Sequence, residues 1–202
     1  MGLQSAGRLA GILVLAAGLA GCLDAKVDIA VTSPTTARAV MTQEMGADFY
    51  AMIKTNAAEA KSDTAADGEF CATGTLTENA DGSATCVIIE NGPFAELTLG
   101  NEKKTVTFTP AGPGLVRVAL PTVEMKGEIG VDDAMDEETR QMIEAIFTGH
   151  AITLRFSGRE VTDTNMALSP DRTAAEQVIP FLDLINGTVA LPDELYAVVR
   201  VQ

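Results

Sequence analysis

Residues 25–32 read AKVDIAVT, and this stretch decides how the beginning of the chain folds. Val27, Ile29 and Val31 alternate with polar or small residues. That two-residue period is typical of a β-strand with one face in the core and the other in water. We therefore expect the chain to open with a half-buried strand whose apolar face needs a covering layer.

Further strands are expected where short apolar or alternating runs lie between turn signals. They cover residues 73–77, 84–89, 96–99, 105–109, 115–120, 151–156, 161–166 and 195–201. Strands outnumber helices, and the two do not alternate regularly. The expected fold class is therefore α+β, with a curved, largely antiparallel sheet and two main amphipathic helices packed on it.

The two helices are expected at residues 37–54 and 134–148, where apolar side chains recur at helical spacing. Residues 55–70 are mostly small and polar, and we expect a flexible loop there. Methionine adapts its shape to irregular partners, so a methionine-bearing helix face can line a site for an apolar ligand. The candidate lining residues are Met41, Met45, Phe49, Met52, Met142 and Ile146, although ordinary core packing explains such stripes as well.

The composition and net charge of the chain disfavour some classes of partner. The chain has 202 residues and a formal net charge of −14, with 47% hydrophobic residues. The negative charge disfavours nucleic acid as a partner and loose adsorption to anionic lipids. Attachment to a membrane would therefore need a covalent anchor.

The first 21 residues have the pattern of a secretory signal. Arg8 precedes an apolar stretch, residues 9–19, of about 11 residues, which is shorter than the roughly 20 that a membrane-spanning helix needs. The stretch ends in Leu19-Ala20-Gly21-Cys22, which resembles the lipobox of bacterial lipoproteins. This resemblance implies cleavage before Cys22, lipid on its thiol, and one mature domain of residues 22–202. An uncleaved signal anchor and an ordinary signal peptide remain the alternatives.

The residue after the lipobox cysteine bears on location. In Gram-negative lipoproteins an aspartate there usually signals retention at the inner membrane, and this chain has Leu23. The resemblance therefore implies the periplasmic face of the outer membrane, if the source has one.

Two cysteines remain once Cys22 is assigned to lipid. An even pair in an exported protein suggests a disulfide, here between Cys71 and Cys86. Two free buried thiols are the alternative. A metal pair is disfavoured because the sequence has one histidine, His150.

The sequence has no clear motif for catalysis or for binding a metal ion. Serine hydrolysis needs a base, and His150 has no G-x-S-x-G motif near it. The acidic group Asp132, Asp133, Asp136, Glu137 and Glu138 does not have the spacing of a calcium loop, and carboxylates at a helix start are favoured by its dipole. We therefore expect a protein that is not an enzyme, with no cofactor and no metal.

The order of elements resembles LppM-type bacterial envelope lipoproteins. A strand follows the lipobox at once, and residues 154–158, LRFSG, lead into residues 161–165, VTDTN, in a strand-turn-strand element similar to theirs. The turn here has Ser157-Gly158 where the family commonly has Pro-Gly, and the family's late tryptophan is missing. The resemblance implies an α/β module with an apolar groove. Together these features favour a membrane-anchored, non-catalytic binding module for lipid or another hydrophobic ligand; the alternative is a structural or assembly lipoprotein that binds an envelope protein.

Overall fold

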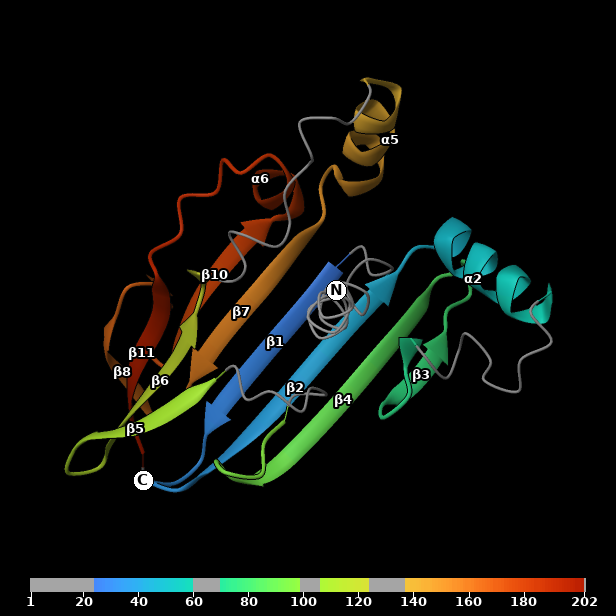
Figure 1. Ribbon diagram of the computed structural model, residues 1–202. Helices are drawn as coiled ribbons and strands as arrows, with labels where there is room; N and C mark the ends of the chain where they lie inside the picture. The colour runs from blue at the N-terminus through green and yellow to red at the C-terminus, as the bar shows by residue number, and fades with distance from the viewer. Residues whose placement is uncertain (1–23, 60–69, 99–105, 124–136, 202) are drawn as a thin grey trace, which may run out of the picture.

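The computed structural model describes residues 24–59, 70–98, 106–123 and 137–201, which form two sheets and three helices (Figure 1). The larger sheet has the strand order β3-β4-β2-β1-β7-β10-β9, and the smaller has the order β5-β6-β11-β8. All paired strands are antiparallel except β1 and β7. The α+β class is confirmed, but the strands divide into two sheets where we expected one.

The strands of the larger sheet are β1 (Asp24–Val31), β2 (Thr36–Met45), β3 (Thr75–Glu78), β4 (Ala84–Pro93), β7 (Ala151–Ser157), β9 (Ala167–Leu168) and β10 (Ala174–Pro180). Those of the smaller sheet are β5 (Thr107–Gly112), β6 (Leu115–Pro121), β8 (Glu160–Thr164) and β11 (Glu194–Arg200). The helices are α2 (Ala47–Glu59), α5 (Glu137–Phe147) and α6 (Phe181–Ile185).

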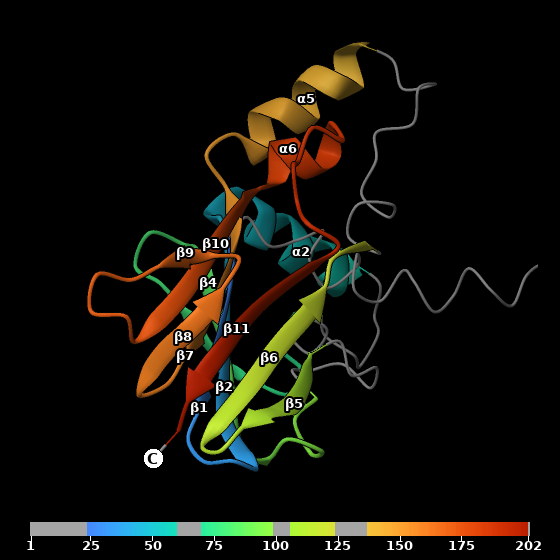
Figure 2. The ribbon, with the colours of Figure 1, turned by 90° about the vertical axis from the view of Figure 1, so that its left-hand side faces the viewer.

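The main hydrophobic core lies between the two sheets, and Figure 2 shows the smaller sheet in front of the larger one. Ile29 on β1 and Phe156 on β7 contribute from the larger sheet. Val118 on β6 and Val199 on β11 contribute from the smaller one. The alternating residues of the opening strand therefore do what their pattern predicts: one face of β1 packs into a core and the other does not.

The structure corrects the first predicted helix, because β2 occupies residues 36–45 and α2 begins only at Ala47. β2 pairs with β1 on one side and β4 on the other along its whole length. The alternation was hidden in the sequence because a polar residue, Gln43, faces inward while Val40 lies on the other face. Pairing on both edges outweighs the helical spacing of the apolar residues. Residues 55–59, expected in a loop, continue α2.

The two main helices pack at one end of the larger sheet (Figure 1). Tyr50 of α2 lies in the small cluster with Met45 of β2, and Phe147 of α5 packs against the main core. At this end β1 begins at Asp24, β2 finishes at Met45, and β7 begins at Ala151 opposite Pro180, the last residue of β10. The helix α2 follows β2, α5 precedes β7 and α6 follows β10. Connectivity thus places all three described helices at the end where β1 starts. None of them has the length and hydropathy to cross a membrane.

One smaller expectation at the end of β4 is also wrong. Asn91 to Pro93 are the last residues of β4 and pair with β2. Residues 96–98, expected in a strand, form a turn and irregular chain. Glu90 accepts hydrogen bonds from the backbone N–H and hydroxyl of Thr98, both at 2.7 Å, and so holds this segment against the sheet.

The chain passes from the larger to the smaller sheet at Gly158, between β7 and β8. A Cβ atom there would lie 2.1 Å from Cγ1 of Val199 in the core, far inside van der Waals contact. We expect Gly158→Ala to lower the free energy of unfolding by about 1–3 kcal/mol, the usual cost of overpacking. Urea denaturation of the purified domain measures this.

The same substitution in a Val199→Ala background is the control. In that background Gly158→Ala should lower the free energy of unfolding by less, because the clashing Cγ1 methyl group of Val199 is gone. An equal cost in both backgrounds, or an unchanged unfolding midpoint for Gly158→Ala alone, would contradict the steric explanation.

Candidate functional site

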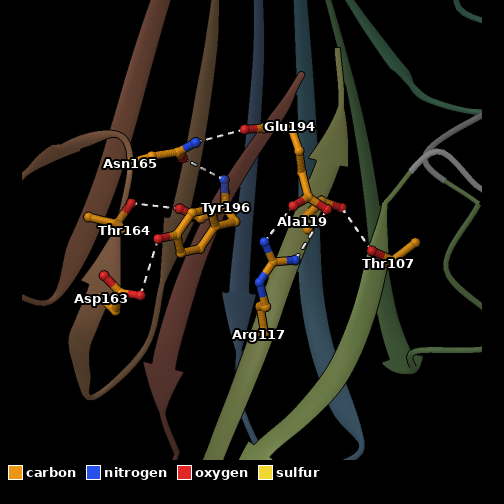
Figure 3. Close-up of polar contacts among 8 residues, drawn as sticks. All are labelled: Thr107, Arg117, Ala119, Asp163, Thr164, Asn165, Glu194 and Tyr196. Atoms are coloured by element: carbon orange, nitrogen blue, oxygen red, sulfur yellow. Dashed lines mark hydrogen bonds and ion pairs between the residues drawn. The ribbon is translucent and has the colours of Figure 1, made fainter. Parts of the chain in front are cut away.

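A cluster of polar side chains covers the outer face of the smaller sheet (Figure 3). Arg117 comes from β6, Glu194 and Tyr196 from β11, and Asp163 from β8. Alternation places Arg117, Glu194 and Tyr196 on the face away from the core, since their neighbours Val118, Leu195 and Ala197 are buried. Asp163 reaches the same face because the β8–β11 register shifts between Val198 and Val199, which leaves Asp163 opposite Val198.

Arg117 is the centre of this network. Its guanidinium Nη1 donates to Oε2 of Glu194 at 3.2 Å, and Nη2 donates to Oε1, so the ion pair is bidentate. The guanidinium carbon lies 4.4 Å from the ring centroid of Tyr196, a cation–π distance. The hydrogen bond from Arg117 lowers the pKa of Glu194 and raises that of the guanidinium. The Tyr196 hydroxyl donates to Asp163 at 3.2 Å, and this bond raises the tyrosine pKa.

Neighbouring side chains tie β8 to β11. The Asn165 amide donates to the Glu194 carbonyl at 2.7 Å and accepts from the Tyr196 N–H at 2.9 Å, so it acts as one more rung of the sheet. The Thr164 hydroxyl donates to the Tyr196 carbonyl at 2.6 Å. These groups use their hydrogen-bonding capacity on one another, and Arg117 already covers a face of the tyrosine ring. The cluster is therefore suited to holding strands together and offers no activated nucleophile.

The single histidine lies at the helix-bearing end of the larger sheet. Nδ1 of His150 is 2.8 Å from Oδ2 of Asp24, and Oδ1 of the same carboxylate accepts from the Ala151 N–H at 3.0 Å. Asp24, the first residue of β1, is thus fixed to the start of β7. Within the ranges that the structure describes, no hydroxyl or thiol is hydrogen-bonded to the histidine ring. The sequence could not reveal this pair because its members are 126 residues apart.

An apolar row crosses the inner face of the larger sheet where neither hydrophobic cluster fully covers it. We define the apolar row as Val27, Met41 and Ile88, which are register partners on β1, β2 and β4. All three are half-buried. Val27 packs against the main core, whereas Met41 and Ile88 belong to neither that core nor the small cluster beneath α2. Within the described residues, Met41 and Ile88 are thus inward-facing apolar side chains that lie between the two clusters.

The disulfide lies beside this row. Cys71 and Cys86 are bonded, as the sequence led us to expect, with their Cα atoms 5.6 Å apart. A bridge closing a 15-residue separation stabilises the fold by roughly 3 kcal/mol in the loop-entropy model. A Cβ atom on Gly74 would lie 2.7 and 2.9 Å from the two sulfurs and 2.9 Å from Ile88. Only glycine therefore fits between the disulfide and this end of the apolar row.

The six candidate lining residues do not form one surface. Met41 and Met45 lie on a strand, so the premise that they share a helix face with Met52 is wrong. Met45 and Phe49 pack in the small cluster with the buried Tyr50, and Met52 is 48% exposed. Ile146 is half-buried on α5, the helix that also carries Met142, whose side chain lies outside the described part. Of the six, Met41 alone lies in the apolar row.

Other expected sites fall partly or wholly outside the described residues. Cys22 and the signal sequence are among the residues not described, as are Asp132, Asp133 and Asp136. Glu137 and Glu138 are exposed in the first turn of α5, where the helix dipole favours them. Within the described ranges, no three His, Cys, Asp or Glu side chains come together in a way that could hold a metal ion.

Comparisons with known proteins add little to this picture. No model of a known protein family matches the chain, and no curated protein matches it. Among solved structures, the NMR structure of the folded domain of Mycobacterium tuberculosis LppM is similar, with a TM-score of 0.45 and 10% sequence identity. The alignment covers 89% of this chain and 90% of that one. A likeness this distant says nothing about ligand or activity.

The Arg117 network predicts a pH dependence of stability. The pKa of Glu194 is lowered in the folded state, so the ion pair stabilises the fold above the ordinary glutamate pKa of 4.5, and this contribution is lost as pH falls through the folded pKa. We expect Arg117→Gln to reduce the free energy of unfolding at pH 7 by up to about 1 kcal/mol, since the pair is partly exposed. The difference from the unmodified protein should shrink below pH 4.5.

Urea denaturation at a series of pH values between 7 and 3 measures this difference. Comparing the two proteins at each pH cancels the contributions of groups that do not interact with Arg117. Arg159→Gln, at an exposed position, is the matched control and should show no such trend. A difference that stays constant with pH would show that Arg117 acts through packing alone.

Proposed function

We propose that the chain is a bacterial envelope lipoprotein, anchored by lipid on Cys22. The support is the sequence Leu19-Ala20-Gly21-Cys22 after an apolar stretch too short to span a bilayer. The net charge of −14 strengthens the case for a covalent anchor, because an acidic domain gains nothing from anionic head groups. With leucine at position 23 in place of the retention aspartate, the periplasmic face of the outer membrane is the proposed location in a Gram-negative source.

We further propose that the mature domain is a non-catalytic binding module for an acyl chain or similar hydrophobic ligand. One observation carries this: in the half-buried apolar row of Val27, Met41 and Ile88, the last two side chains lie between two hydrophobic clusters and belong to neither. An acyl chain laid along the row would remove these side chains from water, at about 0.8 kcal/mol for each buried CH₂ group.

The surroundings of the row suit such a ligand. Met41 has a flexible, polarizable side chain that can adapt to a bent chain. The buried Gln43 lies next to it, with its amide nitrogen 3.9 Å from the methionine sulfur, and supplies a polar group at one side of the row. On the other side lies the Glu90 carboxylate, which accepts two hydrogen bonds from Thr98. Its negative charge would repel an anionic head group. We therefore expect the polar end of a ligand to lie toward Gln43.

Adjacent isoleucines on β4 provide a matched test of ligand binding. Ile88 faces inward with the buried Cys86, whereas Ile89 faces outward and is 53% exposed. We expect Ile88→Gln to weaken binding of a fluorescent fatty acid at least about tenfold, corresponding to the roughly 1.5–3 kcal/mol of burying such a side chain. Ile89→Gln should leave the affinity within about twofold.

Circular dichroism must show that both variants are folded, and Met41→Gln serves as a second inward variant should Ile88→Gln unfold. Native mass spectrometry of the unmodified domain should show retained lipid. Bare protein mass together with no binding of the fluorescent fatty acid would refute the proposal and favour a protein partner for the same surface.

The anchor has its own test, independent of the ligand. When cells that express the full chain are grown with radiolabelled palmitate, the protein should become labelled. Cys22→Ala should abolish the label because the thiol that accepts the lipid is gone. Cys86→Ala controls for nonspecific loss, since that cysteine is in the disulfide and should leave the label unchanged. Equal label in the full chain and in Cys22→Ala would contradict acylation at Cys22.

A further inference from the structure

We infer that the helix-bearing end of the domain faces the bilayer that holds the anchor, with the exposed side of α2 against the lipid surface. This inference rests on the proposed anchor at Cys22. It assigns an orientation and a contact surface that neither the anchor nor the apolar row defines.

The tether between the proposed anchor and the domain is short. One residue, Leu23, separates Cys22 from Asp24, so the Cα atoms of residues 22 and 24 lie at most about 7 Å apart. Asp24 cannot lengthen the tether by detaching easily, because it is the first residue of β1 and is hydrogen-bonded to both His150 and the Ala151 N–H. The start of β1 must therefore stay close to the membrane.

The helices lie at the same end of the larger sheet as the start of β1. All three described helices are attached there, through β2, β7 and β10 (Figure 1). The turn between β1 and β2, with Thr35, lies at the other end of β1. Seven residue steps along this strand span about 23 Å, so a single short anchor cannot bring both ends to the bilayer.

The exposed side chains indicate which helix lies against the bilayer. The helix α2 buries Tyr50 and half-buries Phe49 and Ile53, and it exposes Met52 and Thr55 on the other side. Met52 is 48% exposed, an apolar side chain suited to the head-group boundary.

The charges of the two longer helices point the same way. The described exposed side chains of α2 include one acid and one base, Asp48 and Lys54. In contrast, α5 exposes Glu137, Glu138 and Glu144 with Arg140 half-buried among them. The acidic helix is repelled by anionic lipid, so α2 is the helix that can approach the bilayer.

The absence of tryptophan from the chain allows a direct test. The chain from Cys22 onward is coupled through that thiol to a maleimide-bearing phospholipid in phosphatidylcholine vesicles; the other two cysteines are in the disulfide and do not react. Met52→Trp places a single tryptophan on α2, and Thr35→Trp places one at the far end as the matched control. Brominated phosphatidylcholine then reports which fluorophore approaches the lipid.

We expect brominated lipid to reduce the Met52→Trp emission about twofold, as for a side chain at the head-group boundary. The Thr35→Trp emission should not change, nor should either emission when Cys22 is blocked before mixing. Equal quenching of both reporters, stronger quenching of Thr35→Trp, or quenching of neither would overturn the inference. Thr55→Trp, one turn further along the exposed side of α2, keeps the test decisive if Met52→Trp disturbs the helix.

This experiment separates the orientation from the proposed anchor. Chemical coupling supplies the lipid whether or not a cell acylates Cys22, so the reporters test the orientation alone. Palmitate labelling in cells tests the anchor alone.

Discussion

The pairing of β1 with strands on both of its edges is the constraint on which the other features depend. It runs antiparallel to β2 and parallel to β7, and its inward residue Ile29 is 1% exposed in the core between the sheets. A strand with partners on both edges cannot shift its register without turning its apolar face to water. Because β1 is also the strand nearest the lipobox, the same pairing that builds the core fixes where the proposed anchor leaves the domain.

The division into two sheets explains why an apolar row remains half-buried. The smaller sheet has four strands and the larger has seven, so it cannot cover the whole inner face. The small cluster around Tyr50 covers one end of β2 and β4, and the main core covers β1 and β7. Met41 and Ile88 lie between these two areas. The proposed ligand site is therefore a consequence of unequal sheets, not of a cavity between helices.

Sequence patterns predicted those parts of the fold that local alternation determines. The strands β1, β7 and β11 were predicted to within one or two residues, and the disulfide followed from the compartment and an even pair of cysteines. β2 was mistaken for a helix because its inward positions include a polar residue, Gln43, and only its pairing with β1 and β4 makes it a strand. The first helix was predicted to end at residue 54, but α2 continues to Glu59. The small and polar residues after position 54 were taken as a loop, yet such residues are compatible with a helix.

The polar contacts could not be predicted for a different reason. Arg117 and Glu194 are 77 residues apart, and Asp24 and His150 are 126 apart. Each such pair depends on which strands become neighbours, and a single sequence holds no local signal of that. The methionine residues did not indicate one ligand surface. Met41 and Met45 lie on the strand β2, whereas Met52 lies on the helix α2, although all three are spaced as on one helix.

Mapping where a bound acyl chain touches the protein shows whether the apolar row is a ligand site. A fatty acid carrying a photoreactive diazirine in its chain, irradiated with the folded domain and followed by peptide mass spectrometry, reports the residues in contact. We expect attachment on β1, β2 and β4 at or next to Val27, Met41 and Ile88. Attachment confined to α2, α5 or the outer faces of the sheets would contradict it.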